Sequence, residues 1–394
     1  MRIASSFSVD PHSGDAGAGA AQDLLARLGG RPDLVVLYTT EHHARPELLG
    51  AIREALPEAQ IVGGTSCGGV MTERGFHASA HGAVGLLGIA DADGSFGVGS
   101  APVAQDAFLA GAQAIEAALT AAERDFEAPV LVWCCQPPGR EEAVIEGIQS
   151  VVGAKVPIIG GSSADEGIAG AWRQFSTDGV LQDHVVVAAL FPTAGHGAAF
   201  QSGYAPAGPA GVVTKAQNRQ VLEIDHQPAS EVYSRWTDGE VPASDIGMIL
   251  AKSTPTPLGR VAGQQNNVPM FVLSHPAMMG AGGDLSLFTD ITEGDEVHLM
   301  RGSPASLVKR AGLVVNDAIA NGGWRREETA GGLVIYCGGC MLHVRDRMPE
   351  VAEQVAEAMH GAPFLGAFTF GEQGAIIDSC NRHGNLMVSA LTFG

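Results

Sequence analysis

Two cysteines and a histidine follow one apolar run near the C-terminus, where residues 333 to 344 read LVIYCGGCMLHV. Cys337 and Cys340 have the Cys-x-x-Cys spacing of a thiol redox pair, and His343 adds a third donor suited to a zinc site. A third interpretation is structural, because a buried cysteine at the end of a strand packs as a small apolar residue. The local residues leave all three interpretations open.

The surrounding sequence favours some of these interpretations over others. A reactive Cys-x-x-Cys pair places its first thiol at a helix N-terminus, but the next helix is predicted to begin only near Met348 and Pro349. A structural zinc site needs further ligands, which Cys380 or His383 could supply, yet the sequence has no second Cys-x-x-Cys. Zinc is therefore the lesser alternative to a buried thiol that lines a pocket.

The strands and helices that are predicted to position these residues occur three times in the chain. Apolar, β-branched runs at 33–40, 129–136 and 332–339 are each followed by apolar positions at intervals of three and four, and then by a second strand that ends in glycine. A helix precedes each run and a hairpin-like segment follows it. We predict an α/β fold of repeated β-α-β-α-β-β units that form layered, helix-covered sheets in two domains.

The spacing of the copies predicts an insertion before the third one. The segment 203–211, GYAPAGPAG, is interpreted as a linker because of its glycines and prolines. This places one domain at 1–204, with copies at about 1–95 and 96–204, and a second at 205–394, with an insert at about 205–295 and the third copy at about 296–394.

The carboxyl ends of the strands are the predicted ligand-binding edge, as in other βαβ sheets. Cys337 aligns with Cys135 and Thr39 in the other copies, so a small polar position recurs at this edge. Glu372 follows the glycine turn of the third copy, where a carboxylate caps the loop or binds a cationic group.

His275 is a separate candidate. It lies among methionines and aliphatic residues in FVLSHPAMM, an apolar surrounding suited to a macrocycle. The structural alternative is a turn histidine before Pro276.

Composition excludes several classes of function. The formal net charge is −20, and lysines and arginines form no basic run, so nucleic acid is not an expected partner. No apolar stretch is long enough to span a membrane, and the N-terminus has no signal-peptide pattern. The six cysteines are few for this length and are expected to be thiols. We expect a cytoplasmic protein.

Three stretches resemble the FIST-domain family: YCGGCMLHVRDRMPEV, PFLGAFTFGEQG and NRHGNLMVSALTFG. The resemblance covers essentially the whole chain, with the FIST N part in the first two copies and the FIST C part after residue 204. Its most specific element is the G-x-x-T-x-G-E turn formed by Gly366, Thr369, Gly371 and Glu372. The resemblance implies a bacterial sensory input module for small ligands.

Around Cys337 and His383 the sequence is similar to stand-alone haem-binding FIST proteins that sense nitric oxide. This similarity implies a haem cofactor and signalling in trans to a histidine kinase or a diguanylate cyclase. His275 is the candidate axial haem ligand. The candidate contacts to haem or to another small ligand are His275, Cys337, Cys340, His343, Gly366, Thr369, Glu372 and His383.

Two alternatives remain at this stage. The same cleft could bind a small metabolite without haem. It could also belong to an enzyme, either haem-dependent or using Cys337, Cys340 or Cys380 as a nucleophile.

Overall fold

The computed structural model describes residues 1–265, 267–376 and 380–394 of the chain. Three units share one order of elements: strand, helix, strand, helix, strand, a two-stranded hairpin and a last strand. The first unit contains β1 (Arg2–Ser8), α1 (Ser13–Leu28), β2 (Leu34–Thr39), η1 (Glu41–His43), α2 (Pro46–Ala55), β3 (Gln60–Thr65), β4 (Val70–Thr72), β5 (Gly75–His77) and β6 (Val84–Ala90).

The other two units repeat this order, with extra short helices in the third. The second unit contains β7 (Ser95–Pro102), α3 (Ala107–Ala121), β8 (Leu131–Gln136), α4 (Glu141–Val152), β9 (Ile158–Ser162), β10 (Gln174–Ser176), β11 (Gly179–Leu181) and β12 (His184–Phe191). The third contains β13 (His196–Ser202), α7 (Pro304–Gly322), η2 (Arg326–Glu328), β23 (Gly331–Cys337), α8 (Gly338–His343), η3 (Arg345–Arg347), α9 (Met348–Ala358), β24 (Phe364–Thr369), β25 (Glu372–Ile376), β26 (Cys380–Gly384) and β27 (Met387–Phe393).

Each unit forms a six-stranded mixed sheet, and each sheet borrows its last two strands from another unit. In the first sheet the order is β1-β6-β2-β3-β10-β11, so the hairpin of the second unit extends it. The hairpin β25-β26 extends the second sheet in the same way, and β4-β5 extends the third. The exchange therefore runs in a closed cycle and ties the three units together. The predicted α/β fold with repeated, helix-covered sheets is confirmed.

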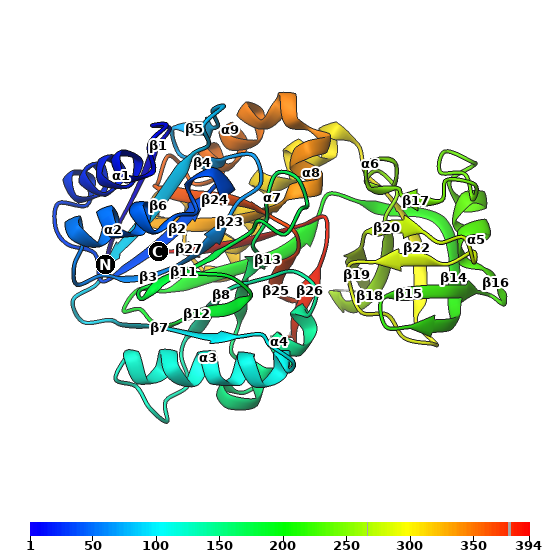
Figure 1. Ribbon diagram of the computed structural model, residues 1–394, viewed down its shortest axis with the longest axis horizontal. Helices are drawn as coiled ribbons and strands as arrows, with labels where there is room; N and C mark the ends of the chain where they lie inside the picture. The colour runs from blue at the N-terminus through cyan, green and yellow to red at the C-terminus, as the bar shows by residue number, and fades with distance from the viewer. Residues whose placement is uncertain (266, 377–379) are drawn as a thin grey trace.

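The three sheets share a buried interior. Tyr38, Trp133 and Ile335, from β2, β8 and β23, belong to one apolar cluster. Separate clusters lie between each sheet and its own pair of helices. The apolar runs of the central strands are continuous rather than alternating because both of their faces are covered. Figure 1 shows α1 and α2 on one side of the core and α3 and α4 on another, and α7 packs against α9 as the third pair.

Residues 205 to 301 form a second lobe, set to one side of the core in Figure 1. It is inserted within the third unit, since β13 pairs with β27 and the chain returns to the core at α7. The lobe contains β14 (Ala205–Gln217), β15 (Gln220–Ile224), β16 (Gln227–Pro228), α5 (Ala229–Trp236), β17 (Gly247–Met248), α6 (Leu250–Ser253), β18 (Leu258–Gln265), β19 (Val268–Ser274), β20 (Pro276–Met279), β21 (Leu285–Leu287) and β22 (Glu296–Arg301).

One local prediction is wrong here. The segment 203–211 is not a linker, because most of it belongs to β14, which pairs with β22. The glycines and prolines instead accompany a break in the register between Pro206 and Ala210. None of the helices in the described parts of the chain is long and apolar enough to cross a membrane.

Candidate functional site

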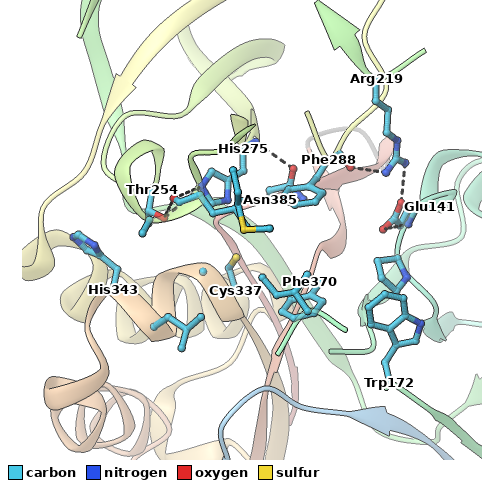
Figure 2. Close-up of a pocket in the computed structure, with 18 residues that line it drawn as sticks. Glu141, Trp172, Arg219, Thr254, His275, Phe288, Cys337, His343, Phe370 and Asn385 are labelled. Carbon is cyan, nitrogen blue, oxygen red and sulfur yellow. Dashed lines mark hydrogen bonds and ion pairs between the residues drawn. The ribbon is translucent and has the colours of Figure 1, made fainter. Parts of the chain in front are cut away.

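A cavity of about 630 Å³ lies between the core and the inserted lobe. The core side is built from the carboxyl ends of β8 and β23 and the segments that follow them, and the opposite side comes from the lobe. Figure 2 shows Glu141 and Arg219 at one end and Thr254, His275 and His343 at the other. The lining residues are Pro138, Gly139, Glu141, Ile168, Trp172, Arg219, Met248, Leu250, Ala251, Thr254, His275, Phe288, Cys337, Gly339, Leu342, His343, Phe370 and Asn385.

The third unit contributes Cys337, the last residue of β23, to the cavity wall. Helix α8 begins at the next residue, so the prediction that no helix starts before Met348 is wrong. Cys337 pairs with Thr369 of the adjacent strand, as Thr39 pairs with Thr65 in the first unit. In the second unit this last position belongs to Gln136.

The predicted match of Cys135 to Cys337 is therefore displaced by one residue along the strand. Cys135 lies in the shared interior instead, where its sulfur is 3.2 Å from the Tyr38 hydroxyl.

The two thiols of the Cys-x-x-Cys sequence are buried and are not bonded to each other. Burial raises the pKa of Cys337 well above its ordinary value, and the neighbouring Cys340 raises it further. The Cys340 sulfur lies 3.7 Å from the hydroxyl of Tyr204. A thiol held protonated is a poor nucleophile and a poor redox catalyst. Its position at a helix start does not overcome the burial.

Thr369 and Glu372 lie behind Cys337, beneath the cavity surface. Glu372 is buried, and its carboxylate oxygens accept hydrogen bonds from the Thr369 hydroxyl at 3.1 Å and the Met387 amide at 3.0 Å. Burial raises the pKa of Glu372 well above its ordinary value, and the nearby Cys337 adds to this. Glu372 is therefore a buried, hydrogen-bonded support of the cavity wall and does not face a ligand.

His275 reaches the cavity from the lobe, with 5% of its surface exposed. Its Nε2 lies 3.1 Å from the Leu250 carbonyl and 3.3 Å from the Thr254 hydroxyl. Because a carbonyl only accepts, Nε2 carries the proton and Nδ1 keeps its lone pair. Burial lowers the pKa of His275 to about 4, so the ring is neutral near pH 7. It can accept a hydrogen bond from a ligand.

Gly339 leaves space between the thiol and the imidazole. A Cβ on this residue would stand 3.6 Å from the Cys337 sulfur and 3.6 Å from Cε1 of His275. The missing side chain opens this corner of the cavity to a ligand atom.

The other end of the cavity holds an ionic cluster that joins the lobe to the core. Arg219, in the turn before β15, donates to Glu141 at 2.8 Å and to Glu142 at 2.6 Å, both at the start of α4. It also donates to Asp290 of the lobe at 2.8 Å. Nε2 of His383 lies 3.9 Å from Glu141 on the core side.

The charges in this cluster stabilise one another. Burial opposes ionisation of Glu141, but His383 and Arg219 outweigh it and hold the pKa of Glu141 below its ordinary value. With three carboxylates around one guanidinium, this end of the cavity carries an excess of negative charge.

The predicted site residues occupy four kinds of position. His275, Cys337 and His343 line the cavity, and Cys340, Thr369 and Glu372 lie close behind Cys337. His383 is a buried member of the ionic cluster, whereas Gly366 packs on Met71 away from the cavity. Sequence reasoning missed several lining residues, among them Glu141, Trp172, Arg219 and Phe288. Their positions depend on how the lobe folds back onto the second unit.

Metal donors are sparse around the thiols. Among the described residues, the groups of three donors whose atoms lie within 4.8 Å are Asp10, His12 and Asp15, and Glu141, Glu142 and His383. Neither contains a cysteine. Both carboxylates of the second group already pair with Arg219.

Comparison with protein families decides the classification. The FIST N domain matches residues 33–227, and the FIST C domain matches residues 229–375. The chain belongs to the FIST family. FIST domains are regarded as small-ligand sensors in signalling proteins, and the cavity of this FIST protein opens at the strand ends where such a fold binds ligands.

Other comparisons add no functional information. No curated protein matches this FIST chain. Among solved structures, a cyanuric acid hydrolase from A. caulinodans is 14% identical, with a TM-score of 0.31 over 50% of this chain and 70% of that one. PurL from T. maritima complexed with AMPPCP is 9% identical, with a TM-score of 0.22 over 99% of this chain and 72% of that one. Both scores are too low to support an argument.

The residues of the cavity do not fit haem. An axial histidine ordinarily has its second nitrogen held by a protein acceptor, and His275 would have to bind iron through Nδ1, close beside its own backbone. Among the described lining residues Arg219 is the only arginine or lysine, and its guanidinium is occupied by three carboxylates, which leaves no cation for haem propionates. Haem therefore stays a prediction from resemblance alone.

Proposed function

We propose that this FIST protein is a cytoplasmic sensor that binds a small, flat, largely apolar ligand between its core and its inserted lobe. The observation that carries the proposal is the cavity of about 630 Å³, whose walls come from two separate parts of the chain. A volume of this size is typical of sites for small molecules.

The lining indicates the chemistry of the ligand. Trp172 and Phe370 form an edge-to-face pair, with ring centroids 6.2 Å apart, and Phe288 lies on the lobe side. Flat apolar surfaces of this kind favour an aromatic or conjugated ligand body. The excess of carboxylates around Arg219 favours neutral or cationic ligands over anions.

The polar groups at the far end suit a single hydroxyl or amine. His275 offers a hydrogen-bond acceptor at Nδ1, and Asn385 and Thr254 line the same region. A ligand that donates one hydrogen bond there would be held in one orientation. Its body would lie along Phe370 toward the ionic cluster.

A ligand bound between two walls would change how they associate. Arg219 holds the lobe on the second unit, and α6 and α8 bring it close to the third. Binding would favour the arrangement in which both walls contact the ligand, at the expense of looser arrangements. This shift is the proposed signal, passed in trans to a partner such as a histidine kinase or a diguanylate cyclase.

A thermal-shift screen of matched aromatic amines, alcohols and carboxylates tests the proposal. We expect stabilisation by neutral or cationic compounds and little by the carboxylates, followed by micromolar binding in calorimetry. If every stabilising compound is an anion, or if none binds the cavity, the proposal is wrong. An absorption spectrum after haem titration is a separate arm, because a Soret band that shifts with nitric oxide would restore the haem prediction.

The thiols do not support the alternative that this protein is an enzyme. Cys337 faces the cavity, but burial holds it protonated. Turnover lost in Cys337→Ala and retained in His275→Asn would nevertheless establish a thiol enzyme over a sensor.

A further inference from the structure

Three histidines gather at the carboxyl end of the central strand of the first unit, outside the cavity. His42 and His43 belong to η1, directly after β2, and His81 lies in the turn before β6. The ring centroids of His42 and His43 are 5.0 Å apart, and those of His42 and His81 are 6.2 Å apart. This is the edge at which the other two units build the ligand cavity, yet the proposed function makes no use of it.

His43 is the fixed member of this cluster. Its ring has no exposed surface, and Nδ1 lies 3.2 Å from the Ser13 hydroxyl. Nε2 is buried and has no hydrogen-bond partner in the described parts of the chain. If Nδ1 donates its proton to Ser13, Nε2 keeps an unused lone pair. Metal-bound histidines are commonly oriented in this way, with the second nitrogen held by a protein acceptor.

Gly82 packs closely against this cluster. A Cβ on Gly82 would collide with the Thr40 hydroxyl and would stand 3.1 Å from Cδ2 of His43, the ring carbon next to Nε2, and 3.2 Å from Cβ of His42. The rings of His42 and His81 are exposed, so they can turn toward the ring of His43 by side-chain rotation.

We propose that His42, His43 and His81 bind a divalent transition-metal ion such as zinc. Imidazole nitrogens suit zinc, nickel and copper, and three of them leave a fourth position for water. The proposal does not depend on the sensor function. It requires small rotations, since the donor atoms of the three rings are not among the groups that already lie within 4.8 Å of one another.

The neighbouring group of Asp10, His12 and Asp15 is the competing site. Its donor atoms already lie within 4.8 Å of one another, but its side chains are at the surface and no buried unpartnered atom points to a ligand there. It therefore serves as an internal control.

Zinc calorimetry and cobalt spectroscopy on the metal-stripped full chain test the proposal. His43→Asn removes Nε2 but keeps a polar group near the position of Nδ1, while His42→Asn and His81→Asn change only surface side chains. We expect one zinc per chain, bound at least about tenfold more weakly by each variant, and a cobalt spectrum without thiolate charge transfer. The matched controls His226→Asn, in the lobe, and His12→Asn should bind as the parent protein does.

Three outcomes would overturn the proposal: no zinc bound at micromolar concentrations, affinity unchanged from the parent protein in the three cluster variants, or weakening by His12→Asn alone. The two surface variants keep the test decisive if His43→Asn folds poorly.

Discussion

The first and third units end their central strands in the same way and use those ends differently. In the first unit Thr39 donates to the Ala83 carbonyl at 2.9 Å, and the Ala83 amide donates to Thr40 at 3.1 Å, so the chain closes its own strand end. In the third unit the chain turns into α8 and leaves Cys337 on an open wall. The inserted lobe supplies the opposite wall. The repeated unit determines where Cys337 lies, and the inserted lobe completes the pocket around it.

The largest effect should come from separating the lobe from the core. Arg219→Met would leave Glu141, whose side chain is 1% exposed, as a buried charge without its guanidinium partner. We expect a loss of about 3 kcal/mol in the free energy of unfolding, measured by urea denaturation. Adding Glu141→Gln should recover much of this loss in a double-mutant cycle.

Arg301→Met is the matched control, because its exposed pair with Glu240 should contribute less than about 1 kcal/mol. Equal losses of unfolding free energy in Arg219→Met and Arg301→Met would show that the ionic cluster does not join the lobe to the core.

The support behind the third strand end should respond to pH. The pKa of Glu372 is raised in the folded state, so the folded protein binds more protons than the unfolded protein above about pH 4.5, and stability falls as the pH rises. Glu372→Gln should therefore gain stability relative to the parent between pH 5 and pH 8. Thermal denaturation across this range checks the slope. Glu353→Gln, on the exposed face of α9, controls for the loss of one negative charge; a parallel slope in both variants would contradict the assignment.

Filling the gap between Cys337 and His275 should affect binding more than folding. Gly339→Ala places a methyl group 3.2 Å from Leu386 and within 3.6 Å of both site residues. We expect about tenfold weaker binding of the screened ligand in calorimetry, with stability changed by less than about 1 kcal/mol. Gly19→Ala in α1, where no atom lies within 4 Å of the new methyl, should leave binding unchanged. Unchanged affinity in Gly339→Ala would place the ligand elsewhere.

The smallest effect is expected when Cys337 of the third unit is replaced by threonine, the residue at the equivalent position, Thr39, of the first unit. Cys337→Thr reproduces the threonine pair found at Thr39 and Thr65. We expect stability within about 1 kcal/mol of the parent and a change in ligand affinity of a few fold. Destabilisation by several kcal/mol would mean that the two strand ends are not equivalent.

The sequence was sufficient to predict the repeated units because their central strands are buried on both faces, which produces long apolar runs. The exchange of hairpins could not be predicted, since strands as short as β4 and β10 carry no register signal of their own. Helix α8 was missed because it opens with Gly338 and Gly339, which have poor helix propensity, and tertiary packing overrides that preference.

The candidate site was predictable only in part. The strand end at Cys337 and the apolar surroundings of His275 are local features that can be read in the chain. Arg219 joins the site through its ion pair with Glu141, which lies 78 positions earlier in the chain. No local sequence pattern indicates such a contact.

Hydrogen exchange of the full chain, with and without the ligand selected by the thermal screen, tests the central claim most directly. We predict simultaneous protection of α8 in the core and of residues 250 to 254 in the lobe, because the ligand contacts both walls. Protection confined to one wall, or found only around residues 40 to 43 and 79 to 82, would contradict a sensor site formed between the third unit and the inserted lobe.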